Sequence, residues 1–141
     1  HKPNAMSCVL RVSGTQGRVL LTGDIEREQE LRLVASGAPL QADVLWVAHH
    51  GSRTSSSAAF LDAVGAQVAV VQAGYRNRFG HPVPEVLARL QERGTLVVRS
   101  DACGAWQWDG HQTLAQARCE RTVQRRYWQH SPHDSPSAGA P

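Results

Sequence analysis

The stretch that decides the fold is Val44-Leu45-Trp46-Val47-Ala48-His49-His50-Gly51-Ser52-Arg53-Thr54-Ser55-Ser56-Ser57. It opens as an apolar run, typical of a buried strand, and ends in two adjacent histidines. A helical pattern follows at 58–64, and Ser55, Ser56 or Ser57 would cap that helix by accepting a hydrogen bond from its free backbone N–H groups. The histidines are therefore expected at the carboxyl end of a strand, where open α/β sheets bind their ligands.

Two other segments also end an apolar run in polar residues. Leu20-Leu21-Thr22-Gly23-Asp24 comes before the histidines, and Gly74-Tyr75-Arg76-Asn77-Arg78-Phe79-Gly80-His81-Pro82 comes after them. If the three strand ends meet at one sheet edge, they bring together a carboxylate, imidazoles and an amide. This combination predicts a metal and phosphate site.

The whole-chain composition limits the classes of protein to consider. A length of 141 residues suits one domain, and 41% hydrophobic with 19% charged residues is typical of globular chains. A net charge of +3 is compatible with an anionic partner. Cys8, Cys103 and Cys119 are odd in number and lack metal-ligand spacing, so we expect reduced or core cysteines and no disulfide framework.

The remaining pattern predicts an α/β fold with a mixed sheet and covering helices. Alternation of strand and helix from 43 to 99 favours right-handed crossovers. Arg118, Arg121 and Arg125 lie at helical spacing, and residues 129–141 are expected to form a disordered tail. The expected elements are a hairpin of strands at 7–12 and 18–22, helices at 26–36, 58–64 and 84–93, and strands at 43–48, 67–72, 95–99 and 103–109.

Three motifs together resemble one known family. Leu20–Asp24, Ala48–Ser52 and Ala73–Pro82, in this order, are similar to the metallo-β-lactamase-like domain of ComEC-type competence proteins. That family internalises DNA across the inner membrane of naturally transformable bacteria. The resemblance covers about residues 4–108. It implies that residues 1–128 are the C-terminal part of an αββα sandwich in a soluble domain of an inner-membrane protein, on a side of the membrane that the resemblance does not specify.

The resemblance also implies roles for individual residues. Asp24 matches a carboxylate that bridges two metal ions, and His50 matches the last histidine ligand of that site. Two consecutive strand residues point to opposite sides, so only one of the two histidines is expected to bind metal. His49, Ser52, Asn77 and His81 match positions typical of this family.

Among these residues, His81 and His49 are the expected catalytic residues. We expect His81 to donate a hydrogen bond to a scissile phosphate or to protonate the leaving group, and His49 to orient or contact the substrate. The substrate-binding residues are expected to be the motif residues Ser52 and Asn77, together with the flanking Arg53, Arg76 and Arg78, whose guanidinium groups suit phosphates.

One motif of the family is absent. The sequence has no His-x-Asp-x-Asp-His or His-x-His-x-Asp-His, which supplies the principal metal ligands. The chain starts at His1 without an initiator methionine, so we expect it to be cut from a longer protein. We expect zinc or manganese in the intact domain, weak or no metal binding in this fragment, and no activity of the fragment alone. Its partners would be DNA, the missing N-terminal half and the membrane channel, with self-association through an uncovered sheet face.

The resemblance implies that the parent domain is a metal-dependent phosphodiesterase, with a nuclease that acts on DNA during uptake as the expected activity. Two alternatives stay open. One is another phosphodiester or phosphocholine-type hydrolase of the same superfamily. The other is a non-catalytic module that binds DNA or gates the channel.

Overall fold

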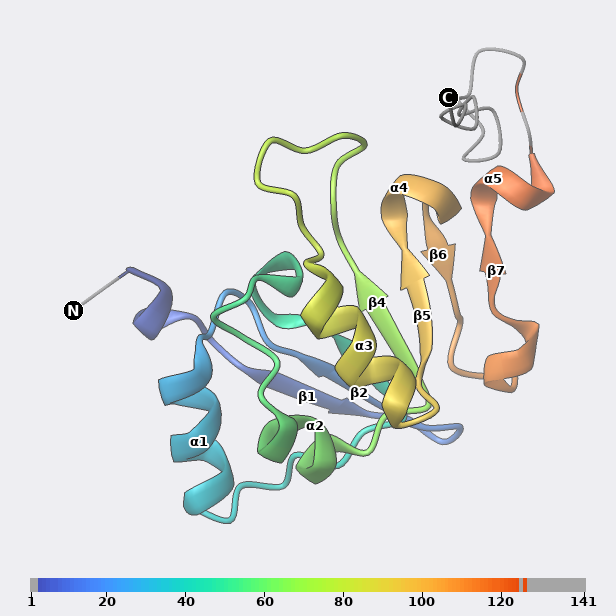
Figure 1. The fold of residues 1–141 in the computed structure, drawn as a ribbon. Helices are drawn as coiled ribbons and strands as arrows, with labels where there is room; N and C mark the ends of the chain where they lie inside the picture. The colour runs from blue at the N-terminus through green and yellow to red at the C-terminus, as the bar shows by residue number, and fades with distance from the viewer. Residues whose placement is uncertain (1–2, 125, 127–141) are drawn as a thin grey trace.

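A five-stranded mixed sheet forms the centre of the molecule in the computed structural model, which describes residues 3–124 and 126 (Figure 1). The strand order is β1-β2-β3-β4-β5. Strand β1 is antiparallel to β2, and β2 to β5 run parallel to one another. The predicted hairpin and central strands are thus confirmed. The strands span Leu10–Ser13 (β1), Arg18–Leu21 (β2), Val44–Trp46 (β3), Val68–Val71 (β4) and Leu96–Arg99 (β5).

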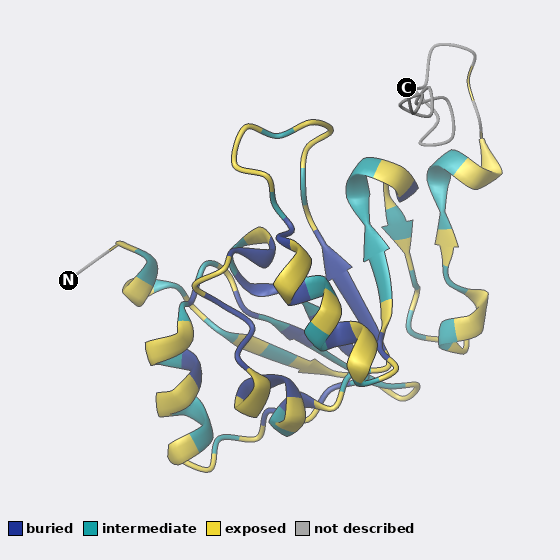
Figure 2. Ribbon diagram, viewed as in Figure 1, coloured by how far each residue is buried: buried dark blue, intermediate teal, exposed yellow. Residues whose placement is uncertain are grey.

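The three predicted helices cover one face of this sheet. They are α1 (Arg27–Ala35), α2 (Ala58–Val64) and α3 (Pro84–Glu92). Proline at the first position of α3 needs no backbone hydrogen bond there, and Gly65 ends α2 in the left-handed conformation. Figure 2 shows the central strands and the inner sides of these helices as buried. The main core joins Leu20 and Leu45 of the sheet to apolar residues of the helices, which include Phe60, Leu61, Val64, Val86 and Leu90.

The opposite face of the sheet carries the alternate residues of each strand. Val44, Val68 and Val70 are buried there against Trp106 and Trp108. These tryptophans belong to or adjoin a second, two-stranded sheet of β6 (Trp106–Gln107) and β7 (Arg118–Cys119).

The second sheet leaves part of this face uncovered. Leu10 and Val12 pair across β1 and β2 with Leu21 and Val19, so they share the side of the central strands that faces the tryptophans. They are 56% and 48% exposed, and Leu96 at the other end of the sheet is 63% exposed. The exposed apolar face is therefore defined by Leu10, Val12 and Leu96.

The region after β5 differs from the prediction. Cys103 does not open a strand, because Ser100–Cys103 form the short helix α4 and β6 begins only at Trp106. Arg118 lies in β7 rather than in a helix, while Arg121 lies in α5 (Glu120–Val123). Arg125 and the predicted tail at 129–141 lie outside the described residues. Within residues 3–124 and 126, no helix combines the length and the apolar character that crossing a bilayer requires.

The prediction for the cysteines was wrong for two of the three. Cys103 and Cys119 form a disulfide, and Cys8 is free and exposed. The antiparallel pairing of β6 with β7 puts Trp106 opposite Cys119, which brings the end of α4 to the start of α5. The two Cα atoms lie 4.8 Å apart, within the range that a disulfide bridges. Residue spacing alone could not show this pairing, because it depends on how the second sheet folds back.

Candidate functional site

A tight turn directly after β3 carries the two histidines. Ala48–Gly51 form a short 3-10 turn in which His49 and His50 have φ angles of 50° and 56°. This left-handed conformation is uncommon outside glycine and is concentrated at functional sites. The strand does not continue through the histidines, so the expectation that they point to opposite sides was wrong. Both rings instead approach the segment after β2, since His49 lies near Glu26 and His50 near Asp24.

Contacts to both neighbouring motifs hold this turn in place. The His49 backbone N–H donates to the Gly23 carbonyl at 3.0 Å, and the Val83 N–H donates to the Gly51 carbonyl at 3.0 Å. Gly51 has φ of 79°, and a Cβ atom there would lie 2.6 Å from the Pro82 Cβ. Only glycine fits this position. The structure therefore brings the three predicted strand ends together.

The serine-rich segment after the turn is held by a buried carboxylate. Glu30 of α1 is fully buried, and its two oxygens accept the backbone N–H groups of Ser56 at 2.5 Å and Ser57 at 2.8 Å. The predicted serine cap of α2 was wrong, because Ser57 occupies the cap position without a side-chain cap bond. Glu30 instead holds the two residues directly before the helix through their backbone N–H groups. Ser55 donates its hydroxyl to the Ala48 carbonyl at 2.9 Å, which links this segment to the histidine turn.

Asp24 and His50 form the part of the site that suits a cation. The His50 Nδ1 lies 2.8 Å from the Gln72 carbonyl, which can only accept, so this nitrogen carries the proton. The other ring nitrogen, Nε2, lies 3.7 Å from Asp24 Oδ1. Two donors that are each about 2.0–2.2 Å from one zinc ion lie at most ~4 Å apart. The pair therefore fits two ligands of one ion.

The rest of the described chain does not complete a metal site. Among residues 3–124 and 126, no group of three or more histidine, cysteine, aspartate or glutamate side chains could hold a metal ion. A catalytic zinc has three protein ligands and one open position. The residues present thus fit part of such a site.

His81 reaches the same region from the loop between β4 and α3. Its ring centroid lies 6.2 Å from that of His49 and 5.9 Å from that of Phe79, onto which it stacks. Burial is the main cause that lowers the pKa of His81 below its ordinary value, and the nearby charges of His49 and His50 lower it further. Its Nδ1 is buried without a hydrogen-bond partner among the described residues. His81 is therefore expected to be neutral at pH 7.

The amide of Asn77 holds the loop closed at its base. It donates to the carbonyls of Gly74 at 3.2 Å and His81 at 2.6 Å, and its oxygen accepts the His81 N–H at 3.0 Å. The Ser100 hydroxyl bonds both backbone groups of Ala73, where the loop begins. Between these anchors lies an open pocket of about 540 Å³. Its lining includes His50, Gln72, Asn77, Phe79, His81 and Ser100.

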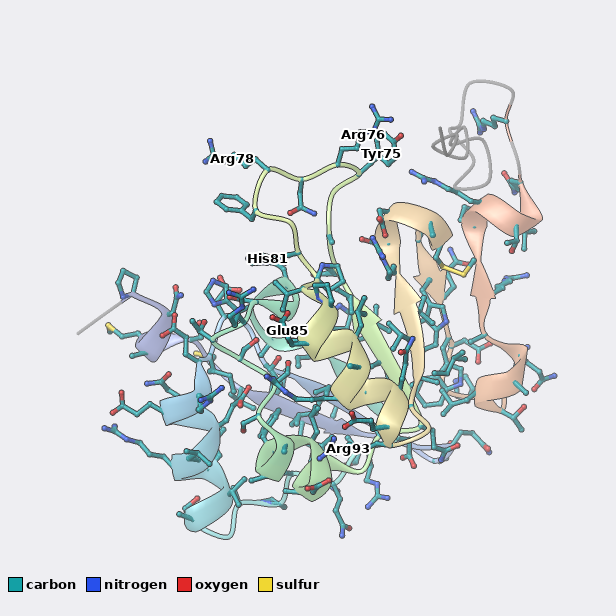
Figure 3. All side chains as sticks on the ribbon, viewed as in Figure 1. Tyr75, Arg76, Arg78, His81, Glu85 and Arg93 are labelled. Atoms are coloured by element: carbon teal, nitrogen blue, oxygen red, sulfur yellow. A yellow bond between two sulfur atoms is a disulfide. The ribbon has the colours of Figure 1, made fainter. Side chains whose placement is uncertain are left out.

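The other predicted substrate-binding residues lie in different surroundings. Ser52 is buried, and its Oγ accepts the Thr54 N–H at 3.4 Å. Arg53 forms an ion pair with Glu85 of α3 at 3.1 Å. Arg76 and Arg78 lie at the outer end of the loop and point outward, away from His81 (Figure 3).

Sequence reasoning missed several residues that shape the site. Glu26, whose Oε1 lies 3.8 Å from His49 Nδ1, is two residues after Asp24 and so had a detectable signal. Glu30 had none, because a glutamate in a helical pattern is ordinarily exposed. Arg89 of α3 donates to the Ser56 carbonyl at 2.9 Å, another contact between distant segments.

Comparison with known proteins gives clear relatives, although no protein-family model matches the chain. It is 39% identical over 132 residues to competence protein ComA of Neisseria gonorrhoeae, which covers 93% of this chain and 19% of that protein. It is 38% identical over 89 residues to ComE operon protein 3 of Bacillus subtilis (63% and 12%). Against recombination protein 2 of Haemophilus influenzae the identity is 36% over 101 residues (72% and 13%). The chain spans about a fifth or less of the length of these relatives.

Proposed function

Because this chain is homologous over most of its length to a segment of the ComEC-type competence proteins, we propose that it acts in DNA uptake as part of a metal-dependent phosphodiesterase. In this proposal the site after β2, β3 and β4 acts on DNA while it is internalised. The observation that carries the proposal is the Asp24–His50 pair. The Gln72 carbonyl binds Nδ1 of His50 and so orients the ring, and Nε2 lies near the Asp24 carboxylate. Histidine ligands of metals commonly have such a hydrogen-bonded partner on the second nitrogen.

The proposal includes the wider architecture. The five-stranded sheet with α1, α2 and α3 on one face would be half of a metallo-β-lactamase αββα sandwich. The support is the exposed apolar face of Leu10, Val12 and Leu96, which a second sheet would cover. The remaining metal ligands would come from that second half. The membrane channel of the same protein would deliver the DNA.

Each residue of the site has a role in this proposal. Asp24 and His50 hold a zinc or manganese ion, which when bound supplies a Lewis acid and a more acidic water molecule. His81 is neutral at pH 7, so it donates one N–H to a phosphate oxygen or accepts a proton, rather than acting as a charged acid. His49, next to Glu26 and Thr54, orients the substrate. Arg76 and Arg78 contact phosphates, while Arg53 is paired with Glu85.

The metal part of the proposal is tested by calorimetry on the 141-residue chain. Titration with zinc or manganese should give weak binding, because two protein ligands are present. Asp24→Asn should abolish that binding, whereas Asp109→Asn, in the second sheet region, should leave it unchanged. Tight stoichiometric binding by the wild-type chain would contradict the proposal that half the site is supplied from elsewhere.

The activity is tested in a chimaera. The matched region of the Neisseria gonorrhoeae relative is replaced with this chain, and transformation frequency is measured together with manganese-dependent DNA cleavage by the purified protein. Asp24→Ala and His50→Ala should abolish cleavage, while Arg11→Ala, on β1 away from the site, should not. A chimaera that transforms but cleaves DNA equally well with Asp24→Ala would refute the catalytic role.

A second candidate is a non-catalytic module that binds DNA. The observation in its favour is that residues 3–124 and 126 provide no group of three metal-binding side chains. It predicts that the chimaera transforms normally without metal-dependent cleavage. In that outcome, substitution of Arg76 and Arg78 should reduce transformation, whereas substitution of Asp24 should not.

A further inference from the structure

The loop between β4 and α3 extends from the sheet edge as a long projection (Figure 1). We call residues 74–80 the finger. Its two aromatic rings, Tyr75 and Phe79, are 47% and 64% exposed, although large apolar rings are ordinarily buried. Each has an arginine beside it. The Arg76 guanidinium carbon lies 5.2 Å from the Tyr75 ring centroid, and that of Arg78 lies 4.8 Å from the Phe79 centroid.

The charge of the finger has one sign. No aspartate or glutamate occurs between Gly74 and Pro82. Among the described residues, neither Arg76 nor Arg78 forms a salt bridge, in contrast to Arg53, which is paired with Glu85. The two guanidinium groups are therefore available to an anionic partner, and Figure 3 shows both at the outer end of the finger. Arginines with exposed aromatic rings match the two parts of a nucleic-acid strand, its phosphates and its bases.

Phe79 connects the finger to the candidate site. It lines the pocket together with His50 and His81, and its ring stacks on His81 at an angle of 16° between the ring planes. The base of the finger is fixed by the three hydrogen bonds of Asn77. A base that stacks on Phe79 would thus hold the neighbouring phosphate close to His81 and the Asp24–His50 pair.

We propose that the finger selects unpaired nucleotides, with Phe79 and Tyr75 as stacking surfaces for bases and Arg76 and Arg78 as phosphate contacts. This inference rests on the proposed function, in which the substrate is DNA, and specifies single-stranded DNA. Bases in a duplex are stacked on each other and cannot offer their faces to a protein ring, whereas phosphates are present in both forms. When Arg78 moves to a phosphate, the ring face it contacts becomes free for a base.

The test uses the 141-residue chain in EDTA, so that binding is measured without cleavage. Fluorescence anisotropy gives the Kd for oligothymidylate and for a hairpin duplex of equal length. Phe79→Leu should raise the Kd for the single strand roughly tenfold, the typical effect of losing one stacked base, and leave the duplex Kd nearly unchanged. Phe79→Tyr, the matched control, should keep single-strand binding. Arg78→Gln should weaken binding to both forms.

A second readout reports stacking directly. The fluorescence of 2-aminopurine in the oligonucleotide should be quenched by the wild type and Phe79→Tyr, but not by Phe79→Leu. Equal weakening of both DNA forms by Phe79→Leu, or no weakening, would overturn the inference, as would absence of binding by the wild-type chain. If the chain binds single strands with these effects but the chimaera does not cleave DNA, the role of the finger is supported and only the proposed hydrolase activity is refuted.

Discussion

At the scale of single residues, the buried Glu30 carboxylate organises the segment that supports the histidine turn. Its two oxygens accept the buried backbone N–H groups of Ser56 and Ser57. Glu30→Ala should lower the free energy of unfolding by about 2–4 kcal/mol, because two buried N–H groups lose their partner. Urea denaturation measures this change. Glu28→Ala, an exposed position on the same helix, should cost less than about 0.5 kcal/mol. Equal effects of the two substitutions would contradict the role of Glu30.

His81 makes the stability of the folded chain depend on pH. Burial and the charges of His49 and His50 lower its pKa in the folded state, so the unfolded chain binds the proton more readily. The contribution of His81 to stability is therefore fully present above about pH 6.5 and decreases as the pH falls toward its folded pKa. The free energy of unfolding is measured by urea denaturation in EDTA at about pH 7.5 and at about pH 5.5. The loss of stability between these two pH values should be smaller for His81→Gln than for the wild type. The exposed His111→Gln serves as control. If His81→Gln loses as much stability between the two pH values as the wild type does, the lowered pKa of His81 is contradicted.

At the scale of elements, the small second sheet depends on its covalent link. Strands β6 and β7 contain two residues each. The disulfide joins Cys103 to Cys119, which are 16 positions apart in the sequence. Replacing both cysteines with serine should lower the free energy of unfolding by about 3 kcal/mol, the typical value for a loop of this length. Cys8→Ser, at an exposed free cysteine, is the control. Equal stabilities of the double variant and the control would show that the second sheet packs without its link.

Features that depend on neighbouring residues in the chain could be predicted from the sequence, whereas features that depend on contacts between distant residues could not. The apolar runs at 18–22, 43–48 and 67–72 predict their strands because periodicity is local, and the α2 prediction at 58–64 agrees with the structure for the same reason. The left-handed His49–His50 turn and the bonds from Ser56 and Ser57 to Glu30 could not be predicted. They depend on contacts with residues more than twenty positions away along the chain.

At the scale of the whole molecule, the exposed apolar face of Leu10, Val12 and Leu96 should cause self-association. Burial of such a face removes apolar surface from water, and β1 is an edge strand with unpaired backbone groups. Sedimentation velocity should show a larger species as the concentration of the chain rises. Leu10→Lys should suppress it, while Leu31→Lys, at an exposed leucine on α1, should not. A monomer at all concentrations would contradict this expectation.

The disulfide between Cys103 and Cys119 makes the chain sensitive to the redox state of its surroundings. Protein disulfides persist in oxidising compartments and are reduced by the glutathione and thioredoxin systems of the cytosol. The state of this pair therefore reports whether the environment of this segment is oxidising or reducing. Alkylation of intact cells with a mass-tagged maleimide, before and after reduction, measures it. We expect only Cys8 to react before reduction, and Cys103 and Cys119 to react as well after it, which is the result for an oxidising environment.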